Sequence, residues 1–271
     1  MTHASTFSGI GAPDYAASKL GWENIFHCEI NPFGQKILKR HFPNSISYGD
    51  ISKTDFTKHK GTIDVLSGGF PCQDASIAKQ RGQGQQGLQG SRTGLLWEML
   101  RAIREIRPRY VVPENVENLL RTNGGQDFRT ILSELAGMGY NAEWRVCRAS
   151  DVGAPHHRAR LYMVAFPKCV RLQKGQTFFS LLRDQASQIS WEFAGTTIQT
   201  FRGGHWACEP PAICVDDGLS FGLDEFTGSQ WRKEQLMAYG NAIVPEIPYR
   251  IFKVIEEYEK ENRLYRAPDW R

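Results

Sequence analysis

The sequence predicts an α/β protein with a doubly wound, mostly parallel sheet that helices cover on both faces. Short apolar runs typical of buried strands alternate with segments whose apolar residues recur at helical spacing. Glycine and proline residues mark the ends of many of these segments. The alternation fills the first two-thirds of the 271-residue chain and returns near its C-terminus.

The predicted elements follow one another in a regular order. After a first strand, a turn at residues 7–11 leads into a helix at residues 13–20. A strand at residues 24–28 precedes a helix at residues 32–42, which begins with one proline and stops before another. A short third strand is expected before residue 50. The remaining elements of this part are strands at residues 63–66, 110–112 and 161–166 and helices at residues 95–106 and 128–138.

The pattern changes after Pro167. Residues 168–230 contain Gly, Pro, Ser and aromatic residues without long periodic runs, and helical periodicity returns at residues 247–258. We therefore expect residues 1–167 and 231–271 to form one main domain, with residues 168–230 as a small second region.

The composition is that of a folded protein with a modest positive charge. Hydrophobic residues make up 41% and charged residues 23% of the chain, which argues against intrinsic disorder. The net charge of +4 permits a polyanionic partner without requiring one. No apolar stretch approaches the length of a membrane span, and the N-terminus lacks the basic and apolar segments of a secretion signal. These features predict a cytoplasmic protein with no membrane partner.

The six cysteines form no Cys-x-x-Cys pair, so no disulfide framework is expected. His205, Cys208 and Cys214 could be read as zinc ligands. Their spacing is irregular and a fourth ligand is missing, so scattered buried thiols are the favoured interpretation and no metal is predicted.

Three features in order along the chain favour a nucleoside cofactor. The turn at residues 7–11, Phe-Ser-Gly-Ile-Gly, allows a ligand to approach the backbone at the carboxyl edge of the sheet. Glu29 follows the second strand, where an acid can bind both ribose hydroxyls. Asp50 follows the third strand, where an acid could accept a hydrogen bond from the adenine amino group. Taken singly, these would be a packing turn, a solvated Glu and a capping Asp.

A second kind of chemistry is indicated where the strand at residues 63–66 ends. The sequence Gly68-Gly69-Phe70-Pro71-Cys72-Gln73 places a rigid proline directly before a thiol at the rim of the cofactor crevice. A thiolate is a strong nucleophile once positive charge or backbone N–H groups lower its pKa. The alternative for a lone cysteine is a small buried hydrophobe.

An acid follows at the end of the strand that begins at residue 110, in Pro113-Glu114-Asn115-Val116. Parallel strands deliver their carboxyl ends to the same edge, so Cys72 and Glu114 are expected to face one pocket. A nucleophile beside a carboxylic acid suits addition to an electron-poor ring, in which a ring nitrogen gains a proton as a carbon is attacked.

These motifs resemble those of one family. Phe-Ser-Gly-Ile-Gly, Gly-Gly-Phe-Pro-Cys-Gln, Glu-Asn-Val, Arg158-Ala159-Arg160 and Gly240-Asn241-Ala242-Ile243-Val244-Pro245 occur in the order that marks the DNA cytosine-5 methyltransferases. The resemblance spans about residues 4–167 and 231–256 and is to the small phage and prophage members. It implies a Rossmann-like S-adenosylmethionine-dependent methyltransferase domain with a small target-recognition lobe at residues 168–230.

The resemblance also implies roles for individual residues. Cys72 would be the nucleophile on cytosine carbon 6, and Glu114 would hold the ring nitrogen and amino group. Arg158 and Arg160 would steady the flipped base and neighbouring phosphates. The S-adenosylmethionine pocket would be lined by Phe7, Gly9, Ile10, Gly11, Glu29, Ile30, Asp50, Ile51, Pro71, Leu95, Asn241 and Ala242.

Partners follow from the same resemblance. It implies double-stranded DNA as substrate, a cognate restriction endonuclease in the same host or phage, and a monomeric enzyme. The Gln/Gly-rich residues 79–93 are expected to close over flipped DNA, the alternative being a disordered surface loop.

The chain departs from the family pattern in two places. His156 stands where the family has Gln, and Asp74-Ala75-Ser76 replaces an aromatic residue common after Pro-Cys-Gln. Two other functions remain open. A tRNA cytosine-5 methyltransferase is disfavoured because its Cys-Phe-Thr signature is absent. A non-catalytic DNA-binding relative would have no need of Cys72.

Overall fold

The computed structural model describes residues 1–71, 94–152, 157–170, 176–185 and 243–261, together with Ala154 and Leu172. Cys72, His156, Asn241, Ala242 and residues 79–93 therefore lie outside the described residues, as does most of the region 168–230. In the described part of the chain, no helix combines the length and apolar character needed to cross a bilayer.

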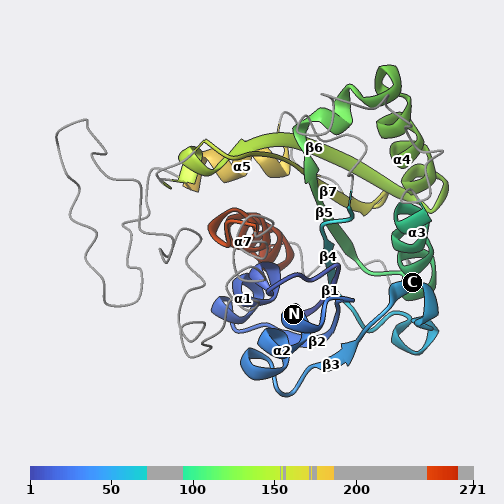
Figure 1. The fold of residues 1–271 in the computed structure, drawn as a ribbon. Helices are drawn as coiled ribbons and strands as arrows, with labels where there is room; N and C mark the ends of the chain where they lie inside the picture. The colour runs from blue at the N-terminus through green and yellow to red at the C-terminus, as the bar shows by residue number, and fades with distance from the viewer. Residues whose placement is uncertain are drawn as a thin grey trace, which may run out of the picture.

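The described chain alternates strands and helices, as the sequence predicts (Figure 1). The strands are β1 (Thr2–Thr6), β2 (Glu23–Cys28), β3 (Ile46–Tyr48), β4 (Val65–Gly68), β5 (Tyr110–Val116), β6 (Tyr140–Arg148) and β7 (Ala159–Pro167). The α-helices are α1 (Ala12–Lys19), α2 (Pro32–His41), α3 (Gly94–Ile106), α4 (Gln126–Gly137), α5 (Phe178–Gln185) and α7 (Glu246–Glu261). Short 3₁₀ helices are η1 (Ile51–Lys53), η2 (Thr57–His59), η5 (Glu117–Leu120), η6 (Thr122–Gly125) and η7 (Ala149–Val152).

The strands form one sheet in the order β3-β2-β1-β4-β5-β7-β6. Strands β3 to β5 pair in parallel, whereas β7 runs antiparallel to both β5 and β6. Strands β2 and β3 are added on one side of β1, whereas β5, β7 and β6 lie on the other side, beyond β4. The carboxyl ends of β1 and β4 therefore lie at a topological switch point, where open α/β sheets bind their ligands.

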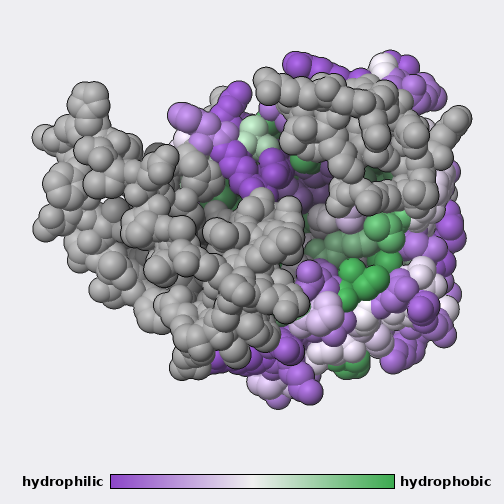
Figure 2. Space-filling model, in the orientation of Figure 1, coloured by the Kyte–Doolittle hydropathy of each residue, from purple (hydrophilic) through white to green (hydrophobic). Residues whose placement is uncertain are grey.

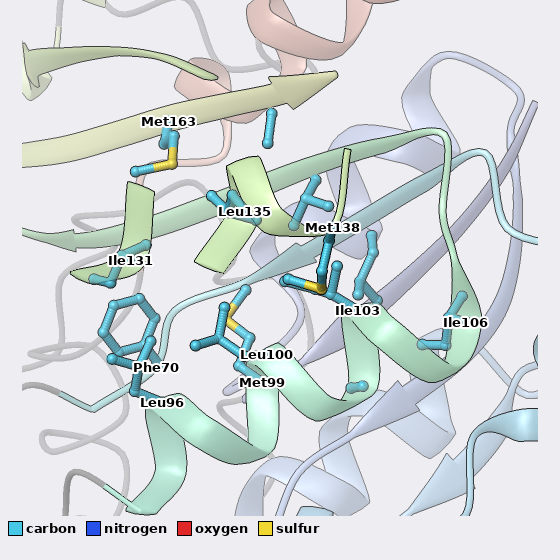
Figure 3. Packing of buried hydrophobic residues seen from close by; sticks show 14 of the residues in the cluster. Phe70, Leu96, Met99, Leu100, Ile103, Ile106, Ile131, Leu135, Met138 and Met163 are labelled. Carbon is cyan, nitrogen blue, oxygen red and sulfur yellow. The ribbon is translucent and has the colours of Figure 1, made fainter. Parts of the chain in front are cut away.

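Two buried clusters fill the space on the two faces of the sheet. On one face, α3 and α4 supply apolar side chains that interdigitate, among them Leu96, Leu100, Ile103, Ile131 and Leu135 (Figure 3). On the other face, α1, α5 and α7 cover the strands (Figure 1). The doubly wound architecture is thus confirmed, because α3 and α4 bury apolar residues against one face and α1, α5 and α7 against the other.

Two elements were missed by the sequence pattern. Strand β6 lies at the sheet edge, where half-exposed residues such as Glu143 and Arg145 weaken the apolar alternation. Helix α5 lies within the expected second region, yet Phe178 and Phe179 are buried in the core. The backbone N–H of Phe178 donates to Glu143 Oε2 at 2.8 Å, so β6 caps this helix. The described part of α5 therefore packs against the sheet through β6 and the buried cluster.

The described cysteines are free, and not all of them are buried. Cys28 and Cys147 lie inside the protein, as expected for structural thiols, whereas Cys169 is exposed. The expectation of scattered buried thiols is wrong for Cys169, which follows the end of β7 in a surface turn.

A buried polar network lies between β1 and α1. His3 and Asp14 are fully buried, and His3 Nδ1 lies 3.9 Å from Asp14 Oδ1. The Ser5 hydroxyl lies 2.9 Å from both Asp14 carboxylate oxygens and 2.6 Å from the Ser8 hydroxyl. His3 also contacts Asn24 Oδ1 and Ser67 Oγ. The network therefore joins α1 to the start of the Gly-rich turn.

We expect His3 and Asp14 to give opposite pH dependences of stability. Burial lowers the pKa of His3 from 6.5 to about 4, so His3 alone makes the protein more stable as the pH rises through that interval. Burial raises the pKa of Asp14 from 3.8 to about 7, so Asp14 alone makes it less stable as the pH rises. The two effects offset each other between about pH 4 and 6.5.

Single substitutions should separate the pH dependence due to His3 from that due to Asp14. As the pH rises, Asp14→Asn should become more stable between about pH 4 and 6.5, where only the His3 effect remains, and His3→Gln should become less stable between about pH 4 and 7, where only the Asp14 effect remains, each by an amount on the order of 2–4 kcal/mol. Urea unfolding across this pH range measures both differences. Parallel pH profiles for the two variants and wild type would contradict the assignment.

Candidate active site

The carboxyl ends of β1, β4 and β5 meet at one edge of the sheet. Gly68 pairs with Thr6 of β1 on one side and with Pro113 of β5 on the other. The residues that follow these positions, Gly69 to Pro71 and Glu114, consequently lie next to each other. The two strands therefore end at the same edge of the sheet, as expected, whereas the prediction that Cys72 and Glu114 face one pocket stays a prediction.

Glu114 is held by an arginine from the neighbouring strand. Arg160 of β7 places its Nε 2.9 Å from Glu114 Oε1, because antiparallel pairing sets β7 beside β5. Burial raises the pKa of the Glu114 carboxyl, while the charges of Arg160 and Arg158 act in the opposite direction. The net effect is a raised pKa, and in its protonated form the carboxyl can donate a hydrogen bond.

The structure therefore brings together three of the four predicted catalytic residues. Glu114, Arg158 and Arg160 share one electrostatic environment at the end of β5. Cys72 is outside the described residues, but the chain leading to it is described through Pro71, which is half-buried beside the same site.

Asn115 fixes the approach to Cys72, a role that the sequence reasoning did not assign. Its buried side-chain amide donates to the carbonyl oxygen of Phe70 at 2.9 Å. This bond ties the end of β5 to the residue before Pro71. The position of Asn115 directly after Glu114, at a strand end, was the available signal.

A side chain at Gly68 and a side chain at Gly69 would collide with different neighbouring atoms. A Cβ at Gly68 would lie 2.8 Å from the carbonyl oxygen of Thr6 and would also overlap Thr6 Oγ1. A Cβ at Gly69 would lie 2.9 Å from Glu114 Oε2 and 3.8 Å from Ile243 Cδ1. The segment just before α7 thus reaches the site, directly after the predicted pocket residues Asn241 and Ala242.

Alanine at these two positions should have separable effects. Gly68→Ala presses on backbone in the core and should lower the free energy of unfolding by about 1–3 kcal/mol. Gly69→Ala displaces the Glu114 carboxyl and should slow catalysis by about 10- to 100-fold with little loss of stability. Denaturant unfolding and single-turnover rates compare the two. The interpretation is wrong if Gly69→Ala is as active as wild type.

The turn at residues 7–11 lies against the end of β2 and the start of α2. Phe7, Gly9 and Gly11 have positive φ angles of 52°, 57° and 88°. A Cβ at Gly34 of α2 would lie 2.6 Å from the carbonyl oxygen of Gly9, so only glycine permits this approach. Above Gly9 itself the described structure leaves open space, since an added Cβ would meet no described atom within 4 Å.

Glu29 holds this turn in place. Its Oε2 accepts from the backbone N–H of Gly9 at 2.6 Å, and its Oε1 accepts from that of Asn31 at 2.8 Å. Each carboxylate oxygen has a second acceptor site, which leaves capacity for ribose hydroxyls. Beside it, the Ile30 side chain is 68% exposed and offers an apolar surface to a flat ring.

Asp50 is a capping residue, which was the alternative interpretation from the sequence. Its Oδ1 accepts from the backbone N–H of Ser52 at 3.0 Å and from the Ser52 hydroxyl at 2.7 Å, and these bonds lower its pKa. Capping leaves Oδ2 3.7 Å from Lys53 Nζ at the surface. The adenine contact predicted for Asp50 remains a prediction.

The polar groups at this edge of the sheet fit a nucleoside cofactor, whose hydroxyl and amino groups would donate to carboxylates. Two carboxylates, Glu29 and Asp50, follow adjacent parallel strands, and the open backbone of Gly9 lies beside them. Of the other predicted pocket residues, Ile10 and Ile51 are buried, whereas Leu95 is half-buried at the start of α3. In the view of Figure 2, a hydrophobic surface area lies right of centre, with hydrophilic residues below it and to its right.

Solved structures of methyltransferases share this fold. A DNA modification methyltransferase encoded within an Escherichia coli prophage matches 62% of this chain and 47% of its own, with 24% identity and a TM-score of 0.52. The Entamoeba histolytica methyltransferase EhMeth matches 95% of this chain and 98% of its own, with 14% identity and a TM-score of 0.64. These likenesses confirm the predicted Rossmann-like methyltransferase fold.

Sequence comparisons define the family. The type II methyltransferase M.Eco47II of Escherichia coli is 35% identical over 161 residues, which cover 59% of this chain and 38% of the relative. M.Sau3AI of Staphylococcus aureus is 36% identical over 140 residues, covering 50% of this chain and 34% of the relative. The chain thus spans well under half the length of these curated relatives. The sequence model of the C-5 cytosine-specific DNA methylases matches residues 1–199, and the chain therefore belongs to that family.

Proposed function

We propose that this chain is a DNA cytosine-5 methyltransferase that acts on a cytosine flipped out of double-stranded DNA. The observation that carries the proposal is the Glu114–Arg160 pair, held beside the segment that leads to Cys72. A nucleophile, a proton donor with a raised pKa and a nucleoside crevice at one sheet edge match the needs of this reaction.

The chain's own residues would perform the covalent chemistry. A flipped base is required because the ring cannot be reached while it is stacked. The Cys72 thiolate forms a bond to carbon 6, and the electron pair of the carbon 5–carbon 6 double bond moves into the ring. Glu114 donates a hydrogen bond or proton to the ring nitrogen and accepts from the amino group. Arg160 keeps the carboxyl in this orientation.

The methyl donor would be S-adenosylmethionine, held by Glu29, Asp50 and the open turn at Gly9. When bound, it supplies an electrophilic methyl group to carbon 5. A solvent base then takes the proton from carbon 5, and the electron pair left behind restores the double bond and breaks the bond between carbon 6 and Cys72, which regenerates the thiolate. A proton gained by the ring nitrogen returns to Glu114.

The domain division remains part of the proposal. Residues 1–167 and 231–271 would form the catalytic domain, and residues 168–230 would recognise the target, with α5 joining the start of this region to the catalytic core. Loops mounted on a rigid scaffold commonly carry specificity. Exchanging residues 186–230 for those of a relative with another target should change the methylated site, and an unchanged site would contradict this assignment. A cognate endonuclease, as the type II names of the relatives suggest, and a monomeric state are proposed as well.

Two assays test the proposal. The purified chain should transfer a labelled methyl group from S-adenosylmethionine to duplex DNA and not to tRNA. Bisulfite sequencing of DNA from an expressing host should reveal methylated cytosines within one short recurring sequence. Transfer to tRNA alone would support the RNA-acting alternative. DNA binding without transfer to either substrate would support a non-catalytic relative.

A further inference from the structure

Arg101 of α3 lies between the helix and the turn that carries Asp50. Its guanidinium donates to two acids of its own helix, with Nε 2.7 Å from Glu98 Oε2 and Nη1 2.7 Å from Glu105 Oε1. It also donates to two backbone carbonyls across the gap, with Nη2 2.7 Å from Ile51 O and Nη1 3.1 Å from Thr54 O.

Glu105 of α3 provides a further hydrogen bond between the helix and the segment that follows Asp50. Its Oε2 accepts from the backbone N–H of Phe56 at 3.0 Å, and the Arg101 guanidinium carbon lies 5.8 Å from the centre of the Phe56 ring. Residues 51–56 are thus fixed to α3 by hydrogen bonds at three backbone positions. Bonds to carbonyls from a charged donor are stronger than those between neutral groups.

The turn itself is otherwise organised by local bonds. Asp50 caps η1, and the Thr54 hydroxyl donates to the carbonyl oxygen of Asp50 at 2.8 Å. Such local bonds define the shape of the turn, but they do not set where it lies relative to the rest of the crevice. The contacts of Arg101 and Glu105 do set this position, because they bind the turn to α3, whose apolar side chains are packed in the buried core.

We propose that Arg101 is a positioning residue of the cofactor pocket, which holds Asp50 and Ile51 at the adenine end through the Ile51 and Thr54 carbonyls. The inference rests on the proposed function, since it takes the turn at Asp50 as the adenine site. Arginine suits this role because its planar fork reaches four acceptors in different directions, whereas a lysine ammonium acts as a point charge.

Arg104 offers a matched control on the same helix. Its side chain is 57% exposed and lies 3.4 Å from Glu134 Oε2, away from the turn. The comparison therefore uses Arg101→Met, which keeps the apolar stem, Arg101→Lys, which keeps the charge, and Arg104→Met. Thermal unfolding of each full-length variant reports its folded fraction. If Arg101→Met does not fold, Arg101→Lys carries the test.

The probes are S-adenosylhomocysteine and S-inosylhomocysteine, which lacks the adenine amino group, titrated without DNA by calorimetry. Wild type should prefer the adenosyl compound, because Asp50 accepts from the amino group, by about tenfold. Arg101→Met should weaken binding of the adenosyl compound by about tenfold and reduce the preference to under about threefold. Arg101→Lys should retain part of the affinity for the adenosyl compound and part of the preference for it. Arg104→Met should match wild type in both quantities.

The outcomes separate this inference from the proposed function. A purely structural role would lower thermal stability without changing the preference between the two probes in the folded fraction. An unchanged preference and affinity in Arg101→Met, an equal loss in Arg104→Met, or no preference in wild type would each overturn the inference and leave the methyltransferase proposal standing. Failure of wild type to bind either probe would instead overturn the proposed function.

Discussion

Cys72→Ala is expected to abolish methyl transfer while leaving the binding of DNA and S-adenosylmethionine largely intact. The reason is that alanine has no electron pair with which to form the bond to carbon 6, and without that bond carbon 5 does not become nucleophilic. Single-turnover assays with labelled S-adenosylmethionine measure the loss, and direct titrations measure the binding.

Cys169→Ala is the matched control, because Cys169 is an exposed free thiol in the turn directly after β7, outside residues 186–230, whose exchange tests target recognition. It should retain the wild-type rate. Wild type should also form a stable covalent adduct with DNA that contains 5-fluorocytosine, since fluorine replaces the proton whose loss completes the reaction. Undiminished turnover by Cys72→Ala would show that another group attacks the base.

Glu114→Gln is expected to slow methyl transfer by about 10²–10⁴-fold, which is the usual contribution of a general acid. Glutamine keeps the shape of the side chain but cannot protonate the ring nitrogen. The rate should fall far more than the affinity for the cofactor, because the interaction is strongest in the transition state. The control is Glu117→Gln, which alters an exposed acid of the adjacent 3₁₀ helix and should leave the rate within about threefold of wild type.

The pH profile provides a second readout for Glu114. Burial raises the pKa of its carboxyl, and Arg160 counteracts part of this rise. If the protonated carboxyl is the active form, the rate should decline as the pH rises through that pKa. Removing the arginine charge in Arg160→Met should move this decline to higher pH. A rate loss under about threefold in Glu114→Gln would place the acid elsewhere.

The sequence alone determined most of the elements and the edge of the sheet where the site lies. Helix α3 was predicted at residues 95–106 and occupies Gly94–Ile106, because its apolar residues recur every three or four positions and a proline follows it. Both signals are local. The positions of Glu29 and Asp50 after strand ends were also readable, since parallel strands place their carboxyl ends at one edge. The strand at residues 110–112 was predicted too short, because β5 continues to Val116 and Glu114 lies within it, paired with Tyr162 of β7.

Only the tertiary structure decided how side chains distant in sequence meet. Arg160 reaches Glu114 because β7 pairs antiparallel with β5, a register that no local pattern specifies. Helix α5 is buried through Phe166 and Tyr258, whose rings come from other elements, so its own short sequence carried little signal. Arg101 looks in sequence like one of many charged residues on a helix surface. It can position the Asp50 turn only because folding brings the carbonyls of Ile51 and Thr54 within hydrogen-bonding distance of its guanidinium. This proximity depends on tertiary packing and not on the residue type.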